Sequence, residues 1–304
     1  MPDAVDPAAL HQPVLLAEVI EHLAPASGKR VLDCTLGLGG HSAALLAAGA
    51  VIVGIDRDER ARTLALGRLS AFTERFSVRA GTFAAVAEEL ADAGEGFDAV
   101  LADLGVSSMQ LDDESRGFSM RSIAPADMRM GDGCLDTALS LIDRLDEGGL
   151  ADVIYRFGEE RLSRRIARAL KQARLAGTLE SASELAAVVR AVVPGHTHRH
   201  PAARTFQALR IAINDELGEL ERLLAVLPRL LKAQGRAVVI SFHSLEDRLV
   251  KNAFREGRAR GIYDECARRV VVAGEAELSA NPRAGSAKLR WAVRSSLVQP
   301  EVRA

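Results

Sequence analysis

Glycines and carboxylates recur at spacings that could hold a charged small molecule. Gly37, Gly39 and Gly40 stand in the segment 30–42, where a short apolar strand runs into a glycine-rich turn and an alanine-leucine helix follows. Glycine adopts backbone angles closed to other residues and lets a ligand approach the main chain. The first N–H groups of the following helix point toward such a ligand. A tight strand-to-helix turn without a ligand is the alternative that this segment leaves open.

A carboxylate follows at the end of the next apolar run. Asp56 ends the run 51–56 and lies 19 residues after Gly37, where a nucleotide-like ligand places its ribose hydroxyls. The dinucleotide fingerprint G-x-G-x-x-G fails, because Ser42 stands at its last position. Gly-x-Gly-Gly after an Asp-bearing strand instead resembles the S-adenosylmethionine (SAM) loop of Rossmann-like methyltransferases. The segment therefore favours SAM over NAD.

The elements that position these residues alternate between strands and helices. Strands are expected at 30–34, 51–56, 76–80 and 97–103, with helices at 14–23, after the glycine turn and at 58–69. This alternation predicts a parallel, doubly wound sheet, in which ligands lie beyond the carboxyl ends of the strands. The residues 37–41, Asp56, Phe83 and Asp103 all fall at that edge, and Phe83 could stack on an adenine ring or pack in the core.

A long helical insertion interrupts the sheet. The fifth strand is expected only at 235–242. The interval from Asp103 in the fourth strand to Ala237 in the fifth is 134 residues, whereas a single crossover connection needs roughly 30 residues. We therefore predict an α/β, Rossmann-like class I fold with an inserted all-helical domain at 118–213. The main domain comprises 1–117 and 214–304, with a final edge strand at 286–294.

The charge distribution is uneven. The net charge is −2, yet residues 151–210 hold 11 Lys/Arg against 5 Asp/Glu, and residues 248–304 hold 12 against 6. Two basic segments suggest a polyanionic partner, with solvated helix faces as the alternative. One predicted helix, 159–173, separates an apolar face from a basic arc formed by Arg161, Arg164, Arg165, Arg168 and Lys171.

Other features narrow the class of protein. No apolar run reaches the ~18 residues of a membrane span, and the first residues lack the pattern of a signal peptide. Cys34, Cys134 and Cys266 have neither disulfide nor metal-site spacing, so we expect a cytoplasmic, reduced protein without a membrane. Three histidines in the loop 194–201 could suggest a metal, but no carboxylate or thiol accompanies them, which favours a basic loop. The oligomeric state stays open, a homodimer being one candidate.

The residues around Asp103 suit methyl transfer to nitrogen. Asp103 heads a short polar motif after the fourth strand, where its carboxylate could accept hydrogen bonds from an exocyclic amine, although a turn-forming role is the alternative. Attack by a ring carbon would need a covalent cysteine. Cys34 lies within the first strand and the other two cysteines lie outside any motif, so direct transfer is favoured.

Nearly all of the chain resembles the bacterial 16S rRNA (cytosine-N4)-methyltransferases of the MraW or RsmH type. The resemblance rests on His11-x-Pro-Val-Leu-Leu16, Leu36-Gly-x-Gly-Gly-His-Ser42, Asp103-Leu-Gly-Val-Ser-Ser-x-Gln-Leu-Asp112, Arg116-Gly-Phe-Ser119, Asp127-Met-Arg-Met130, Gly158-Glu-Glu-Arg161, His200-Pro-Ala-x-Arg-Thr-Phe-Gln-Ala208, Ser241-Phe-His-Ser-Leu-Glu-Asp-Arg248 and Asn281-Pro-Arg283.

The resemblance implies an enzyme that methylates a cytidine in the decoding centre of the small ribosomal subunit and releases S-adenosylhomocysteine. It implies a SAM site made of Gly39, Gly40, His41, Asp56, Phe83, Asp103 and Gln110, of which Gln110 follows from the resemblance alone. Asp103 is the expected catalytic residue, no metal is needed, and RNA contacts are expected from Arg164, Arg165, Arg168, Arg204 and His243. A nicotinamide-dependent oxidoreductase and a catalytically silent RNA-binding protein are the two competing interpretations.

Overall fold

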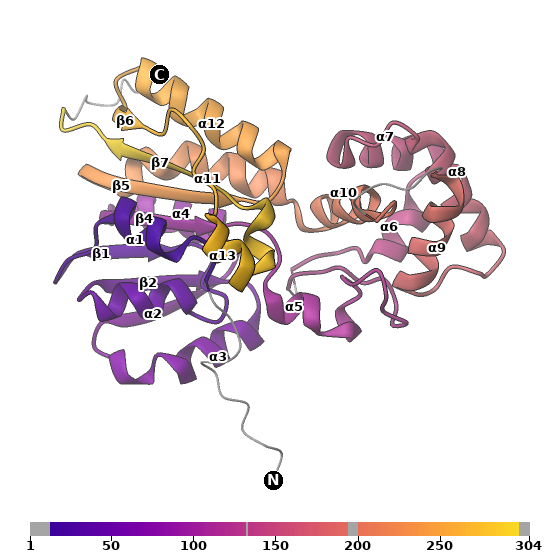
Figure 1. Cartoon of the computed structure of the whole chain (residues 1–304), viewed down its shortest axis with the longest axis horizontal. Coiled ribbons are helices and arrows are strands. Elements are labelled where there is room, and N and C mark those ends of the chain that lie inside the picture. Colours follow the sequence, from indigo (N-terminus) through magenta and orange to yellow (C-terminus); the bar gives the residue numbers. More distant parts are fainter. Residues whose placement is uncertain (1–12, 132, 194–199, 298–304) are drawn as a thin grey trace, which may run out of the picture. The chain divides into compact units, whose positions relative to one another are not determined.

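The computed structural model describes residues 13–131, 133–193 and 200–297. The chain divides into two compact units (Figure 1). Unit 1 comprises Met1–Gly105 and Leu217–Ala304, and unit 2 comprises Val106–Glu216. The expected first boundary, at 117/118, lies 12 residues after the division at 105/106. The expected second boundary, at 213/214, lies 3 residues before the division at 216/217.

Unit 1 is built on one mixed sheet with the strand order β3-β2-β1-β4-β5-β7-β6. The strands are β1 Arg30–Asp33, β2 Val51–Asp56, β3 Phe76–Ala80, β4 Phe97–Asp103, β5 Leu231–Ser241, β6 Tyr263–Cys266 and β7 Lys288–Arg294. Strands β1 to β5 are all parallel to one another, and β7 is antiparallel to both β5 and β6. The order changes direction at β1 and β4, which is where open α/β sheets bind ligands.

Helices cover both faces of this sheet. The helices of unit 1 are α1 Leu16–Leu23, α2 Gly40–Ala47, α3 Glu59–Arg68, α4 Phe83–Asp92, α11 Glu216–Leu230, α12 Ser244–Ala259 and α13 Glu275–Ala280. One apolar cluster joins α4, α11 and α12 to the sheet, and a second joins α1 and α2 to it. The predicted doubly wound α/β fold is therefore confirmed.

Helices joined by loops make up the described part of unit 2, which also has one isolated bridge between Pro125 and Ser181. Its helices are α5 Ser108–Asp112, α6 Ala138–Arg144, α7 Glu147–Gly158, α8 Ser163–Leu175, α9 Ala182–Val192 and α10 Ala203–Asn214. They enclose a separate apolar core. A capping box starts α9, since Ser181 Oγ accepts from Glu184 N and the Glu184 side chain accepts from Ser181 N.

Three sequence-based expectations need correction. The strand predicted at 286–294 is β7, which is not an edge strand because β6 pairs with its outer side. The helix predicted to begin at Glu159 begins at Ser163, because Glu159 adopts left-handed angles (φ 51°) and ends α7. Strand β5 begins at Leu231, four residues before the predicted start.

Part of the predicted features lies outside the described residues. These are His11 of the first motif, the residues 194–199 of the histidine loop, and the two termini. Within the described chain, no helix is both long and apolar enough to span a bilayer.

Candidate functional site

The glycine turn is tied to the end of β2 by Asp56. Gly37 N donates to Asp56 Oδ2 at 2.8 Å, and Asp58 N donates to Asp56 Oδ1 at 2.8 Å. Burial raises the pKa of Asp56, while these two N–H donors act against that rise. Each carboxylate oxygen keeps a further lone pair, so a fixed acceptor stands beside the turn.

The packing around the turn requires glycine at two positions. Gly39 has φ +73°, and a Cβ there would lie 2.9 Å from Leu69 Cδ1. A Cβ on Gly40 would lie 2.7 Å from Pro13 Cγ. Helix α2 starts at Gly40 without a side-chain cap, so its first-turn N–H groups are available to a ligand.

A buried carboxylate that the sequence reasoning did not assign to the site, Asp33, links the turn to β4. Asp33 is 1% exposed, and it accepts from Ser42 Oγ at 2.6 Å and from Thr35 N at 3.2 Å. Thr35 Oγ1 in turn accepts from Asp103 N at 2.6 Å. The signal in the sequence was an acid at the end of an apolar strand. Asp33 therefore positions the turn and, through Thr35, the end of β4.

Asp103 has a carboxylate oxygen without a partner. The side chain keeps 23% of its surface exposed, yet Oδ1 is inaccessible and has no hydrogen-bond partner within the described structure. Burial, followed by the nearby charges of Asp33 and Glu246, raises the pKa of Asp103 to about 8. An unpaired buried acceptor is costly, so the partly exposed carboxyl group of Asp103 is suited to a donor or a cation supplied by a ligand.

His41 lies next to Asp103 as a neutral ring. Its Nε2 is 3.0 Å from Val14 O, and its Nδ1 is 3.8 Å from Asp103 Oδ2. Because a carbonyl only accepts, Nε2 carries the proton and the Nδ1 lone pair faces the carboxyl group. Burial lowers the pKa of His41 to about 4. The ring therefore brings no positive charge to Asp103 at neutral pH.

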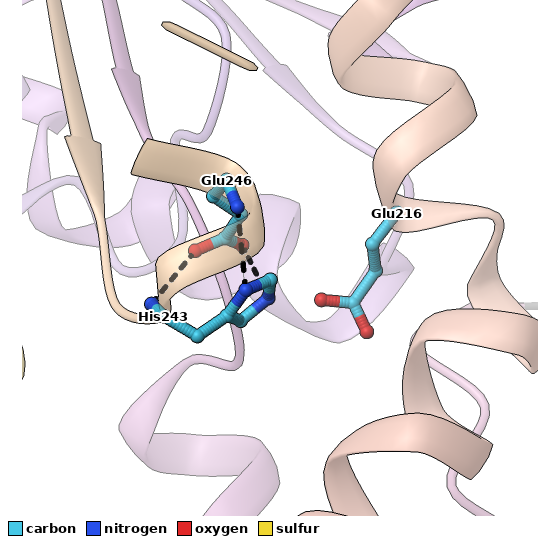
Figure 2. A group of neighbouring side chains, drawn as sticks. All are labelled: Glu216, His243 and Glu246. Atoms are coloured by element: carbon cyan, nitrogen blue, oxygen red, sulfur yellow. Dashed lines mark hydrogen bonds and ion pairs between the residues drawn. The ribbon is translucent and has the colours of Figure 1, made fainter. Parts of the chain in front are cut away.

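His243 and Glu246 form a capping box at the start of α12 (Figure 2). His243 Nδ1 accepts from Glu246 N at 3.3 Å, and Glu246 Oε2 accepts from Phe242 N at 2.8 Å and from His243 N at 3.3 Å. Glu246 is 2% exposed, and its Oε1 is 3.3 Å from His243 Nε2. Glu216, also drawn in Figure 2, forms an ion pair with Arg210 inside unit 2 at 2.7 Å. These contacts give His243 a structural role at the helix start.

The remaining expected site residues fall in both units. Phe83 is the first residue of α4, just beyond the carboxyl end of β3, and it is half-buried against the core. Gln110 belongs to unit 2 and is 6% exposed. Its Oε1 accepts from Ser107 N at 3.1 Å, and its Nε2 donates to Met130 O at 3.2 Å. The structure thus brings Gly39, Gly40, His41, Asp56, Phe83 and Asp103 to one edge of unit 1, with Gln110 in the other unit.

The arginines expected to contact RNA differ in their surroundings. Arg164 and Arg165 are exposed on α8. Arg168 pairs with Glu147, with Nη2 3.0 Å from Oε1. Arg204 on α10 donates from Nη1 to Glu159 O at 3.1 Å. Part of the positive charge of unit 2 therefore holds its own helices together.

The edge of unit 1 fits a cationic, nucleoside-containing ligand. The uncapped start of α2 offers N–H donors, Asp56 stands at the end of β2, and Asp103 offers a buried oxygen without a partner in the described structure. Burial raises the pKa values of Asp33, Asp56 and Asp103, and a cation bound at this edge would favour their ionised forms. SAM, which combines an adenosine with a sulfonium cation, matches these features.

Comparisons with known proteins agree with the geometry. The family model described as "MraW methylase family" matches residues 8–295. A "Ribosomal RNA small subunit methyltransferase H" from Sorangium cellulosum is 50% identical over 288 residues, which cover 93% of this chain and 90% of that protein. A protein of the same name from Acidobacterium capsulatum is 48% identical, and the match covers 93% of this chain and 97% of that protein. Another, from a Synechococcus species, is 49% identical, and the match covers 94% of this chain and 96% of that protein. The chain therefore belongs to the MraW methylase family and is a methyltransferase whose methyl donor is SAM.

Proposed function

We propose that this enzyme transfers a methyl group to N4 of a cytidine in the decoding centre of 16S rRNA in the small ribosomal subunit. The relatives at 44–50% identity carry the name of a small-subunit rRNA methyltransferase and align over nearly their whole length. The observation that carries the proposal is the partner-free buried Oδ1 of Asp103, within the described structure, at the head of the motif after β4.

Gly39, Gly40, His41, Asp56, Phe83 and Asp103 would hold the donor at the carboxyl edge, and Gln110 is proposed as a further contact. When bound, SAM supplies a methyl group on a positively charged sulfur. The uncapped N–H groups of α2 would bind it from one side, and Asp56 would accept hydrogen bonds from its ribose. Phe83 would pack on its adenine ring.

Asp103 would act on the amine. The N4 lone pair of cytosine is delocalised into the ring, so the amine must be aligned for in-line attack. A carboxylate oxygen that accepts an amine N–H holds the nitrogen in that orientation. As the new C–N bond forms, the leaving sulfur keeps the electron pair of the old bond and the amine must lose a proton. Asp103, with a pKa raised to about 8, is suited to take that proton.

The cysteines support direct transfer over a covalent route. Burial raises the pKa of the Cys34 thiol, which disfavours the thiolate. Cys134 Sγ donates to Asn214 Oδ1 at 3.3 Å in unit 2, and Cys266 lies in β6. No thiolate nucleophile is therefore needed in the proposed step.

The two units would divide the work. Unit 1 would bind the donor and perform the transfer, while the helical unit 2, with exposed Arg164 and Arg165, would help to recognise RNA. Such an enzyme would act in the cytoplasm, where ribosomal subunits are present.

Transfer of labelled methyl groups from SAM to small subunits, isolated from cells that lack this enzyme, tests the proposal. Wild-type protein should label these particles and leave large subunits unlabelled. Asp103→Ala should lose transfer with an unchanged circular dichroism spectrum. Wild-type labelling of large subunits only, or full activity in Asp103→Ala, would refute it.

A further inference from the structure

Helix α12 carries a row of cations on its solvent side. Arg248, Lys251, Arg255 and Arg258 are spaced by three, four and three residues, and all four are exposed. This spacing places them on one face of the helix. We call these four residues the basic face of α12.

The opposite side of α12 is fixed firmly to the sheet. Val250, Phe254 and Gly257 are buried, and a Cβ on Gly257 would lie 2.6 Å from ring carbons of Tyr263 in β6. The Phe254 and Tyr263 rings pack edge to face with centroids 5.6 Å apart. The basic face is therefore presented by a rigid element.

The acids of α12 do not lie on the basic face. Glu246 is buried and accepts from the N–H groups of Phe242 and His243. Asp247 pairs with Arg290, with Oδ1 2.7 Å from Nε. Glu256 is exposed, but its position next to Arg255 turns it about 100° away from that residue. The face thus has a concentrated positive charge.

The basic face begins near the candidate methyl-transfer edge. Strand β5 leads through His243 into α12, and Ile240 of β5 pairs with Asp103 of β4. A Cβ on Gly105, just after β4, would lie 3.4 Å from Phe242 Cδ2. From Arg248 to Arg258 the helix advances ~15 Å, so the basic face is long enough to contact more than one phosphate of a single strand.

We propose that the basic face of α12 binds the sugar–phosphate backbone of the RNA strand that carries the methylated nucleotide. This inference rests on the proposed function, and it adds to unit 1 an RNA contact separate from the arginines of unit 2. Contacts of Lys and Arg to phosphates are independent of base sequence, so the basic face would position the strand without selecting the nucleotide.

The test is the salt dependence of RNA binding by Arg255→Gln/Arg258→Gln. Glutamine keeps the helix propensity and most of the side-chain length. The control, Arg229→Gln/Lys232→Gln, removes the same net charge at the end of α11 and the start of β5, where the two cations pair with Asp92 and Asp98. It reports the effect of net charge alone. Arg255→Lys/Arg258→Lys keeps the charge and should behave as wild type.

Two lost phosphate contacts should reduce the slope of log Kd against log salt by about 1.5. Between 50 mM and 200 mM salt, wild-type affinity for small-subunit rRNA should therefore fall about eight-fold more than that of the α12 variant. The control should keep the wild-type slope, and the Kd of SAM should not change in either variant. An unchanged slope in the α12 variant, or an equal change in the control, overturns the inference. A wild-type enzyme that does not bind this RNA refutes instead the proposed function.

Discussion

The unpaired oxygen of Asp103 predicts that SAM binding depends on pH. With a pKa of about 8, roughly one-tenth of Asp103 is ionised at pH 7 and roughly nine-tenths at pH 9. If the carboxylate is the form that accepts the sulfonium cation, the apparent Kd equals the intrinsic Kd divided by the ionised fraction. The Kd of SAM should therefore fall about tenfold from pH 7 to pH 9, or about 1.4 kcal/mol.

Isothermal titration calorimetry measures this dependence directly. Asp103→Asn keeps the shape of the side chain and cannot ionise, so its Kd should vary much less over the same range. The α-amino group of SAM also titrates near pH 8. Any change of Kd with pH that comes from this group will remain in Asp103→Asn, so the variant measures it separately. S-adenosylhomocysteine, which lacks the sulfonium charge, should show a weaker pH dependence than SAM with wild-type protein.

Two results would refute this reasoning. One is a Kd for SAM that is constant between pH 7 and pH 9 in the wild-type protein. The other is the same tenfold change in Asp103→Asn, which would assign the titration to another group. Thermal unfolding of Asp103→Asn would check that the variant is folded. The variant should be more stable than wild type at pH 8, because it lacks the buried carboxylate.

Three further predictions follow from the described contacts. Ligand-free wild-type protein should lose thermal stability relative to Asp103→Asn as the pH rises from about 4 to about 8, because the folded-state pKa of Asp103 is raised to about 8 and the unfolded chain releases that proton first. A difference in melting temperature between the two proteins that stays constant over this range would contradict it. Gly39→Ala should lower the free energy of unfolding, measured by urea denaturation, by about 1–3 kcal/mol and weaken SAM binding, because the position has φ +73° and lacks space for a Cβ. The control is Gly67→Ala inside α3, where a Cβ meets open space, and it should not destabilise the protein. Arg164→Gln should lower RNA affinity and its salt slope more than Arg168→Gln, because Glu147 already neutralises Arg168. Equal effects in filter binding would contradict this.

The inner strands were predictable because buried parallel strands are almost continuous apolar runs bounded by turn residues. The segments 51–56, 76–80 and 97–103 form strands with the predicted bounds. The short strand Tyr263–Cys266 has no such run, since Asp264 and Glu265 are exposed. Its pairing with β7 is therefore visible only in the folded sheet, and it explains why β7 is not an edge strand.

The sequence indicated which residues gather at the carboxyl edge, because parallel strands end there together. It did not reveal their coupling. The raised pKa of Asp103 depends on its burial, on Asp33 at the end of β1, and on Glu246, which is 143 residues away in the chain. The neutral state of His41 likewise depends on its burial and on Val14 O. Such effects arise from packing distances that no spacing pattern contains.

The central claim is that the methyl group reaches the exocyclic amine of a cytidine. Small subunits from cells that lack the enzyme, incubated with wild-type protein and labelled SAM and digested to nucleosides, test it by mass spectrometry. We predict that the label is found in N4-methylcytidine. Label in 5-methylcytidine or in another nucleoside would contradict the account.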